Sequence, residues 1–270
     1  MARNQIENSQ SRYKALIEKV FFDRYEKGAA GVEFEREDLV AAAGELGIQL
    51  PKNLGDVVYS IRYRTPMPDT ILKIQPKGME WIIEGAGRSK YVFKLVRVNR
   101  IVPNRELIAV KIPDSTPEIV NAYALSDEQA LLAIVRYNRL IDIFLGIVAY
   151  SLQNHLRTTV SSIGQVEIDE MYVAVDRHGR QFVLPVQAKG GSDQLSVVQT
   201  KQDIACCAEK YPNLICRSVS AQFMADDLIA LFELTVENDE VKVVDERHYR
   251  LVPSDQIDDG DLRIYSQRSS

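Results

Sequence analysis

Residues 166–189 leave fewer folding choices than any other part of this 270-residue chain. Apolar and polar residues alternate on both sides of a short turn at 177–179, as they do in paired β-strands. Three-residue hairpin loops favour a glycine in the left-handed position, which Gly179 supplies. If Asp176 and Arg180 are the last paired residues, residues whose numbers add up to about 356 face each other. The sequence therefore predicts an antiparallel hairpin of fixed register.

This register brings four polar side chains to one face of the predicted hairpin: Glu167, Asp169, Gln187 and Lys189. The other face is apolar except for Glu170. Carboxylate and amide oxygens are the ligands that Mg²⁺ takes. A lysine beside them can orient a water and offset charge during phosphodiester hydrolysis. The alternative interpretation is structural, a cross-strand ion pair between Glu167 and Lys189.

The second half of the chain alternates between helical and strand patterns around this hairpin. We expect a long buried helix over residues 127–156, capped by Ser126. After it we expect strands at 166–176 and 181–189, a helix at 195–211, and strands at 213–224, 227–237 and 241–252. Such an order predicts an α/β (α+β) core with a central mixed sheet.

Asp169, followed by Gln187-Ala188-Lys189 at the end of the next strand and then by a helix, resembles the PD-(D/E)xK nuclease superfamily. The QAK sequence is similar to the Q-x-K variant of the Mrr-like restriction endonucleases, and the resemblance covers residues 127–236. It implies a restriction-endonuclease-like fold and a requirement for Mg²⁺. It also implies that Asp169 binds the metal, that Gln187 completes the metal site and that Lys189 assists the attacking water. Glu167 is a further candidate ligand and catalytic residue.

The first hundred residues have a different pattern. Helices are expected at 11–26, 33–47 and 54–64, and two strands at 71–85 and 90–98. This order resembles winged helix-turn-helix domains, in which one helix enters the major groove of DNA. The expected DNA contacts are Lys52, Asn53, Ser60, Arg62, Arg64, Arg88 and Lys90. The arginines on the third helix suit bases, and the lysines and Arg88 suit phosphates. A winged helix used for protein contacts is the alternative.

These patterns predict three parts: a winged-helix domain at 1–102, a proline-containing connection at 103–126 and a nuclease domain at 127–270. Charge divides along similar lines within a net charge of -5. Residues 1–112 hold 19 Lys and Arg against 14 Asp and Glu, whereas residues 113–270 hold 14 against 24. The stretch 48–112 is the most basic, with 12 against 5. A basic segment of this kind favours a phosphate-facing surface, although a merely solvated face has the same composition.

Cysteine content and hydropathy set the expected compartment. Three cysteines cannot form a secreted disulfide framework, and the start of the chain has no apolar signal core. We therefore expect a cytoplasmic protein without membrane contact or an organic cofactor. The predicted function is a Mg²⁺-dependent DNA endonuclease of restriction type that acts on double-stranded DNA as a homodimer. The alternatives are a non-catalytic DNA-binding regulator with a degenerate nuclease fold and a structure-specific repair or recombination nuclease.

Overall fold

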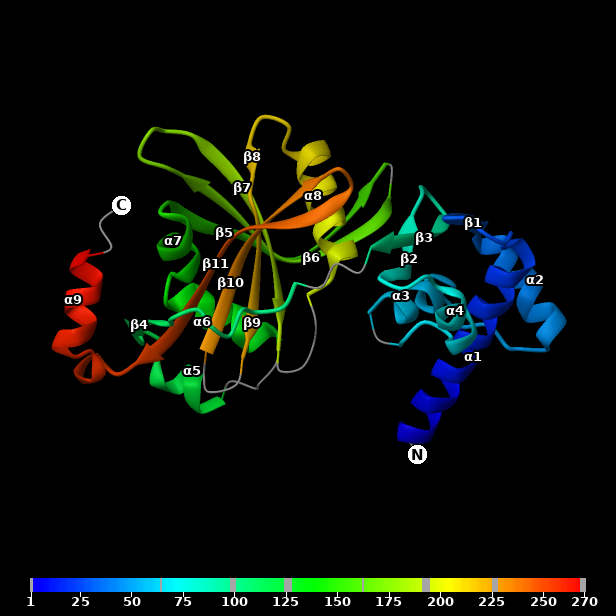
Figure 1. Ribbon diagram of the computed structural model, residues 1–270, viewed down its shortest axis with the longest axis horizontal. Helices are drawn as coiled ribbons and strands as arrows, with labels where there is room; N and C mark the ends of the chain where they lie inside the picture. The colour runs from blue at the N-terminus through cyan, green and yellow to red at the C-terminus, as the bar shows by residue number, and fades with distance from the viewer. Residues whose placement is uncertain are drawn as a thin grey trace. The chain divides into compact units, whose positions relative to one another are not determined.

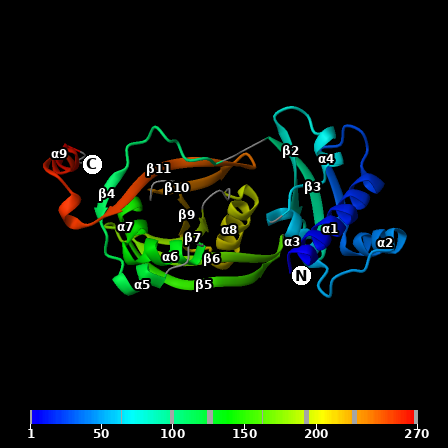
Figure 2. The same cartoon turned by 90° about the horizontal axis from the view of Figure 1, so that it is seen from below.

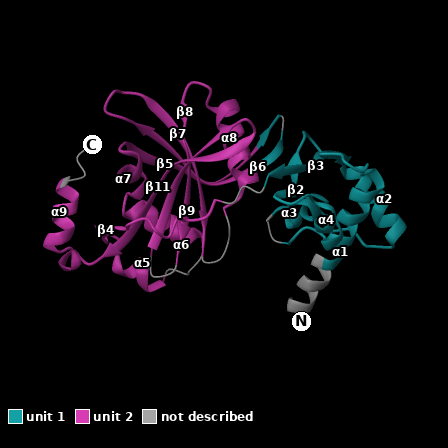
Figure 3. Cartoon of the chain, in the orientation of Figure 1, with its two compact units in different colours: residues 1–99, 159–165 teal, residues 100–158, 166–270 magenta. Residues whose placement is uncertain are grey.

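The structure of the chain, a computed structural model, describes residues 2–63, 65–97, 101–123, 128–161, 163–190, 195–224 and 228–267. The chain forms two compact units (Figure 3), which are unit 1 (residues 1–99 and 159–165) and unit 2 (residues 100–158 and 166–270). No helix in these described ranges is long and apolar enough to cross a membrane.

Unit 1 combines helices with a small antiparallel sheet. Its elements in chain order are α1 (Ala2–Arg24), β1 (Gly31–Glu35), α2 (Arg36–Leu46), α3 (Gly55–Tyr63), α4 (Asp69–Ile74), β2 (Met79–Gly85) and β3 (Lys90–Arg97). The three strands pair in the order β1-β3-β2. Helix and strand side chains share one apolar core, in which the Phe21 ring packs edge to face with Trp81 and Phe93.

Two elements of unit 1 differ from the sequence prediction. Residues 31–35 form a strand because Val32 and Phe34 alternate with exposed neighbours and enter the core. The helix begins only at Arg36, where the side chains of Glu35 and Asp38 cap each other's backbone. Residues predicted as the start of a strand instead form α4, which buries Ile71.

Unit 2 is built around a large mixed sheet. Its elements are β4 (Val110–Pro113), α5 (Glu118–Tyr123), α6 (Glu128–Tyr137), α7 (Leu140–Leu145), β5 (Val148–Val160), β6 (Gly164–Val175), β7 (Gln181–Lys189), α8 (Val197–Lys210), β8 (Ile215–Cys216), β9 (Ser218–Phe223), β10 (Leu228–Glu237), β11 (Glu240–Val252), the short η2 (Ser254–Gln256) and α9 (Asp259–Gln267). The sheet order is β4-β11-β10-β9-β7-β6-β5, with β8 beside β7 (Figure 1). The mixed α/β architecture predicted for this half is confirmed. Part of the stretch expected to be a connection, β4, is an edge strand of the sheet.

The predicted hairpin register is confirmed from its turn to the middle of β6. Paired residues run from Val175 with Gln181 to Glu170 with Val186. Gly179 has a φ of 78°, and its amide donates to the carbonyl of Asp176. A turn with this geometry sets the faces of both strands.

The prediction of one long helix over residues 127–156 is wrong. Helix α6 ends at Tyr137, α7 ends at Leu145, and β5 begins at Val148 (Figure 2). Arg139 and Gly146 both adopt the left-handed conformation, which stops each helix. An apolar run does not by itself distinguish a buried helix from a strand.

The two faces of the sheet are covered by different helices. Figure 1 shows α6 and α7 on one side of the central strands and α8 on the other. Leu184, Val186 and Ala188 of β7 pack with α6 and α7 in the main apolar core. Because strand side chains alternate, Gln187 and Lys189 belong to the face of α8.

Candidate functional site

The centre of the candidate site is the point where β6 and β7 stop pairing. Their ladder ends at Glu170 with Val186, and the next residue on β6 is Asp169. Beyond this point the Asp169 side chain, in place of a backbone carbonyl of β6, accepts a hydrogen bond from β7: its Oδ2 lies 3.0 Å from the amide nitrogen of Ala188. The structure therefore places Asp169 against the middle residue of the QAK sequence.

Charged neighbours surround Asp169. Burial raises its pKa above the ordinary value, and the backbone hydrogen bond from Ala188 and the charge of Lys189 act in the opposite direction. Glu128 and Glu167 raise its pKa further through repulsion. Four titratable groups thus act on one another at the carboxyl end of β7.

Lys189 has a partner that the sequence did not predict. Its ammonium lies 2.5 Å from Oε1 of Glu128, the first residue of α6. The Lys189 side chain is 16% exposed, whereas that of Glu128 is 39% exposed. The ammonium is therefore held at the edge of the site by a carboxylate that water can reach.

Gln187 is completely buried and its amide is oriented. The Thr200 hydroxyl donates to the carbonyl of Ser196 at 3.1 Å, so it must accept from the Gln187 amide nitrogen, at 2.6 Å. The amide oxygen of Gln187 has no hydrogen-bond partner among the described residues. An oriented, unpartnered oxygen is suited to receive a cation or a donor.

Asp203 is a second carboxylate on this face, one helical turn after Thr200. It is fully buried, and neither carboxylate oxygen has a hydrogen-bond partner in the described part of the chain. Burial raises its pKa well above the ordinary value, and the nearby charge of Asp169 adds to this rise. Helix α8 thus directs an uncompensated carboxyl group toward the candidate site.

Glu167 is near this cluster but is engaged elsewhere. Its carboxylate lies 3.1 Å from Arg157 and 3.9 Å from His155, both on β5. The ion pair with Lys189 proposed as the structural alternative is replaced by the pair between Lys189 and Glu128.

Glu170, the exception on the predicted apolar face, has a structural explanation. It is fully buried, and its Oε1 accepts from Arg136 at 2.9 Å and from Ser151 at 2.5 Å. The carboxylate therefore joins α6, β5 and β6 on the face opposite α8.

The predicted DNA contacts of unit 1 separate into two groups. Lys52, Asn53, Arg88 and Lys90 are exposed. Ser60 and Arg62 do not lie on the exposed face where the sequence placed them. Ser60 is buried against the Thr65 hydroxyl at 2.9 Å, and the partly buried Arg62 donates to the carbonyl of Ile83 at 2.8 Å. Arg64 lies outside the described residues.

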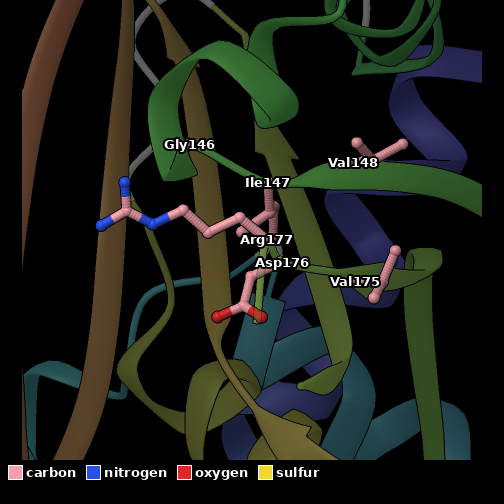
Figure 4. Close-up of a pocket in the computed structure, with 6 residues that line it drawn as sticks. All are labelled: Gly146, Ile147, Val148, Val175, Asp176 and Arg177. Carbon is pink, nitrogen blue, oxygen red and sulfur yellow. The ribbon is translucent and has the colours of Figure 1, made fainter. Parts of the chain in front are cut away.

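A pocket of about 290 Å³ lies at the other end of the hairpin (Figure 4). It is lined by Gly146, Ile147, Val148, Val175, Asp176 and Arg177. Asp176 is already engaged with the amides of His178 and Arg180 and with the Arg180 side chain. None of the predicted site residues lines this pocket, so it is separate from the candidate site.

Sequence reasoning missed Glu128, Thr200 and Asp203. Glu128 was missed because one long helix was predicted over residues 127–156. In that helix the last turn, around residues 153–156, was expected to lie nearest the site, whereas Glu128 is at the start of α6. Asp203 carried a usable signal, because it lies three and four positions before Cys206 and Cys207, on the same helical face. Both cysteines are buried, and so is Asp203.

The described residues contain no group of three or more His, Cys, Asp or Glu side chains arranged to hold a metal ion. Comparisons with family models, curated proteins and solved structures find no significant match to this chain.

Proposed function

We propose that this chain is a Mg²⁺-dependent endonuclease that hydrolyses phosphodiester bonds of double-stranded DNA. The observation that carries the proposal is the meeting of Asp169 with the QAK sequence where β6 and β7 separate. Structural carboxylates have fixed partners, as Glu170 does. Asp169, Gln187 and Lys189 instead combine a partly exposed carboxylate, an unpartnered oxygen and a lysine.

The residues present fit a magnesium ion. Asp169 offers a carboxylate, and the Gln187 amide oxygen is buried without a partner. Both are hard oxygen ligands. When bound, the ion would polarise the phosphoryl group and favour ionisation of a water.

Lys189 would orient the attacking water and stabilise the charge that develops on the phosphoryl oxygens. Its present partner, Glu128, holds the ammonium at the edge of the site. A phosphate that enters the site would compete with this carboxylate for the ammonium. Glu167 is a weaker candidate ligand, because it is already paired with Arg157.

Unit 1 supports a role in DNA binding. Its order of elements, helix, strand, two helices and two strands, is that of a winged helix if the short α4 is set aside. The exposed Lys52, Asn53, Arg88 and Lys90 are the proposed contacts, and Arg64 remains a prediction. The excess of basic residues in the stretch 48–112 favours phosphate binding. Cleavage of both strands would take two copies of the site, so we propose a homodimer.

The test is incubation of the purified chain with unmethylated and methylated phage DNA, with Mg²⁺ or EDTA. We expect discrete fragments that require Mg²⁺ and that disappear in Lys189→Ala. The matched control is Lys210→Ala, which removes an exposed lysine of α8 that pairs only locally with Glu209. If neither DNA is cut while both proteins shift it equally in a gel, the catalytic proposal fails. The non-catalytic regulator would then be the better account.

A further inference from the structure

Polar side chains fill the space between α8 and the sheet, where an apolar layer is usual. This polar layer consists of Gln187, Thr200, Asp203, Ser218 and Ser220. Gln187 on β7 is paired in register with Ser220 on the neighbouring parallel strand β9. Each of the five residues is at most 1% exposed. The layer extends inward from the site described above.

The acceptors of the polar layer exceed its donors. Among the described residues, the Gln187 amide oxygen, both Asp203 oxygens and the hydroxyls of Ser218 and Ser220 are buried without a partner. The Gln187 nitrogen gives one of its two hydrogens to Thr200, and each serine hydroxyl has one hydrogen, so at most three donor hydrogens face the several lone pairs of these five oxygens. Native proteins rarely leave such groups unsatisfied, so the layer indicates missing positive charge or missing donors.

No lysine or arginine of the described residues contacts Asp203 in the polar layer. Among the charges that act on Asp203, Asp169 has the largest effect and Lys189 the smallest. Lys189 contacts Glu128 instead. The other buried carboxylate of the sheet, Glu170, has the Arg136 guanidinium 2.9 Å away. A buried carboxylate without such a partner is costly unless it is neutralised.

We propose that Asp203 and Gln187 form the inner wall of a divalent cation site that they share with Asp169. This inference rests on the proposed function for the outer ligand, Asp169, and adds Asp203 as a residue that binds the ion. Two carboxylates would balance the charge of a divalent ion, and the Gln187 oxygen would add a neutral ligand. Asp169 is partly exposed, so the cation has a route to the layer from the solvent side of that residue.

The experiment measures binding of Mn²⁺, a spectroscopic substitute for Mg²⁺, to the full-length chain by electron paramagnetic resonance and calorimetry. Asp203→Asn should weaken Mn²⁺ binding at least tenfold and reduce the rise in melting temperature that Mn²⁺ causes. The matched control, Asp245→Asn, changes a partly exposed carboxylate of β11 that pairs with Arg247, and it should bind Mn²⁺ like the wild type.

A gain-of-binding variant covers the case in which Asp203→Asn does not fold. Gln187→Glu adds a negative charge at the same position and should tighten Mn²⁺ binding severalfold, which misfolding cannot mimic. Unchanged binding in either folded variant would overturn the inference.

The two proposals fail in different ways. If Asp169→Asn abolishes Mn²⁺ binding and DNA cleavage while Asp203→Asn leaves Mn²⁺ binding intact, only the role of Asp203 is lost. If the wild type neither binds Mn²⁺ nor cuts DNA, both proposals are wrong.

Discussion

Two buried carboxylates lie on opposite faces of the large sheet, and their surroundings differ. Glu170, on the face of α6 and α7, accepts from Arg136 and Ser151. Asp203, on the face of α8, has no hydrogen-bond partner for either oxygen within the residues that the structure describes. Both are fully buried. The comparison teaches that burial alone does not identify a functional carboxylate, whereas burial without a partner points to a missing ligand.

The largest expected effect is a loss of DNA cleavage when the lysine of the candidate site is removed. Lys189→Ala should lower the rate of DNA cleavage on the order of 100-fold or more, because one charged contact to the transition state is lost. Cleavage of a labelled duplex under single-turnover conditions measures this rate. Lys210→Ala should cleave like the wild type. Equal loss in both variants would contradict a specific role for Lys189.

The next effect concerns the partnered carboxylate. Arg136→Ala should lower the free energy of unfolding by about 3 kcal/mol, because it leaves Glu170 buried without its counter-charge. Urea denaturation measures this free energy. The double variant Arg136→Met with Glu170→Met should recover most of the loss, since apolar side chains can replace a buried pair. If the double variant is as unstable as the single one, the pair does more than balance charge.

The unpartnered carboxylate should respond with the opposite sign. In EDTA at pH 7, Asp203→Asn should raise the free energy of unfolding by about 1 kcal/mol, because the carboxyl group is ionised in the unfolded chain and must be neutralised, or buried with its charge, on folding, whereas the amide carries no charge in either state. Urea denaturation of both proteins in the same buffer measures the difference. A marked loss of stability would show that Asp203 is a structural residue like Glu170.

A partly exposed ion pair at the sheet edge should give the smallest effect, and it is the reference for both buried carboxylates. The Lys111 ammonium, 2.7 Å from Asp261, holds the pKa of that carboxyl below its ordinary value of 3.8. The pair therefore stabilises the docking of α9 above pH 3.8 and loses this contribution as the pH falls through the lowered pKa. At pH 7, Asp261→Asn should speed hydrogen exchange in α9 only severalfold and leave β10 unchanged. Faster exchange in both elements would mean that α9 supports the whole sheet.

Local patterns predicted the parts of the site that lie on one hairpin. The turn at Gly179 and the alternation of side chains fixed the register as far as Val186, and Gln187 lies on the face where Thr200 of α8 contacts it. The contact of the Lys189 side chain with Glu128 of α6 was not predicted. The bond between Asp169 and the Ala188 amide was not predictable, because the pattern implied that the ladder continues past Glu170. A hydrogen bond from a side chain that replaces backbone pairing does not change the alternation of apolar and polar residues in the sequence.

The missed residues depend on contacts between distant segments. Glu128 and Lys189 are 61 positions apart, and only the fold of α6 onto the sheet brings them together. Arg62 was expected to contact DNA because it lies off the apolar face of its helix, but the carbonyl of Ile83 on β2 accepts from it. The buried Val57, Val58 and Ile61 of α3 lie at helical spacing, so their burial follows from one helix face and is visible in the sequence.

The division of the chain determines how the protein can be dissected. Residues 159–165, at the turn between β5 and β6, belong to unit 1 although they lie inside the sequence of unit 2. The polypeptide therefore passes from one unit to the other at three places rather than one. A gene truncated at residue 100 would encode unit 2 with a loop taken from unit 1. Independent expression of unit 2 should replace that loop with a short polar turn that joins β5 directly to β6.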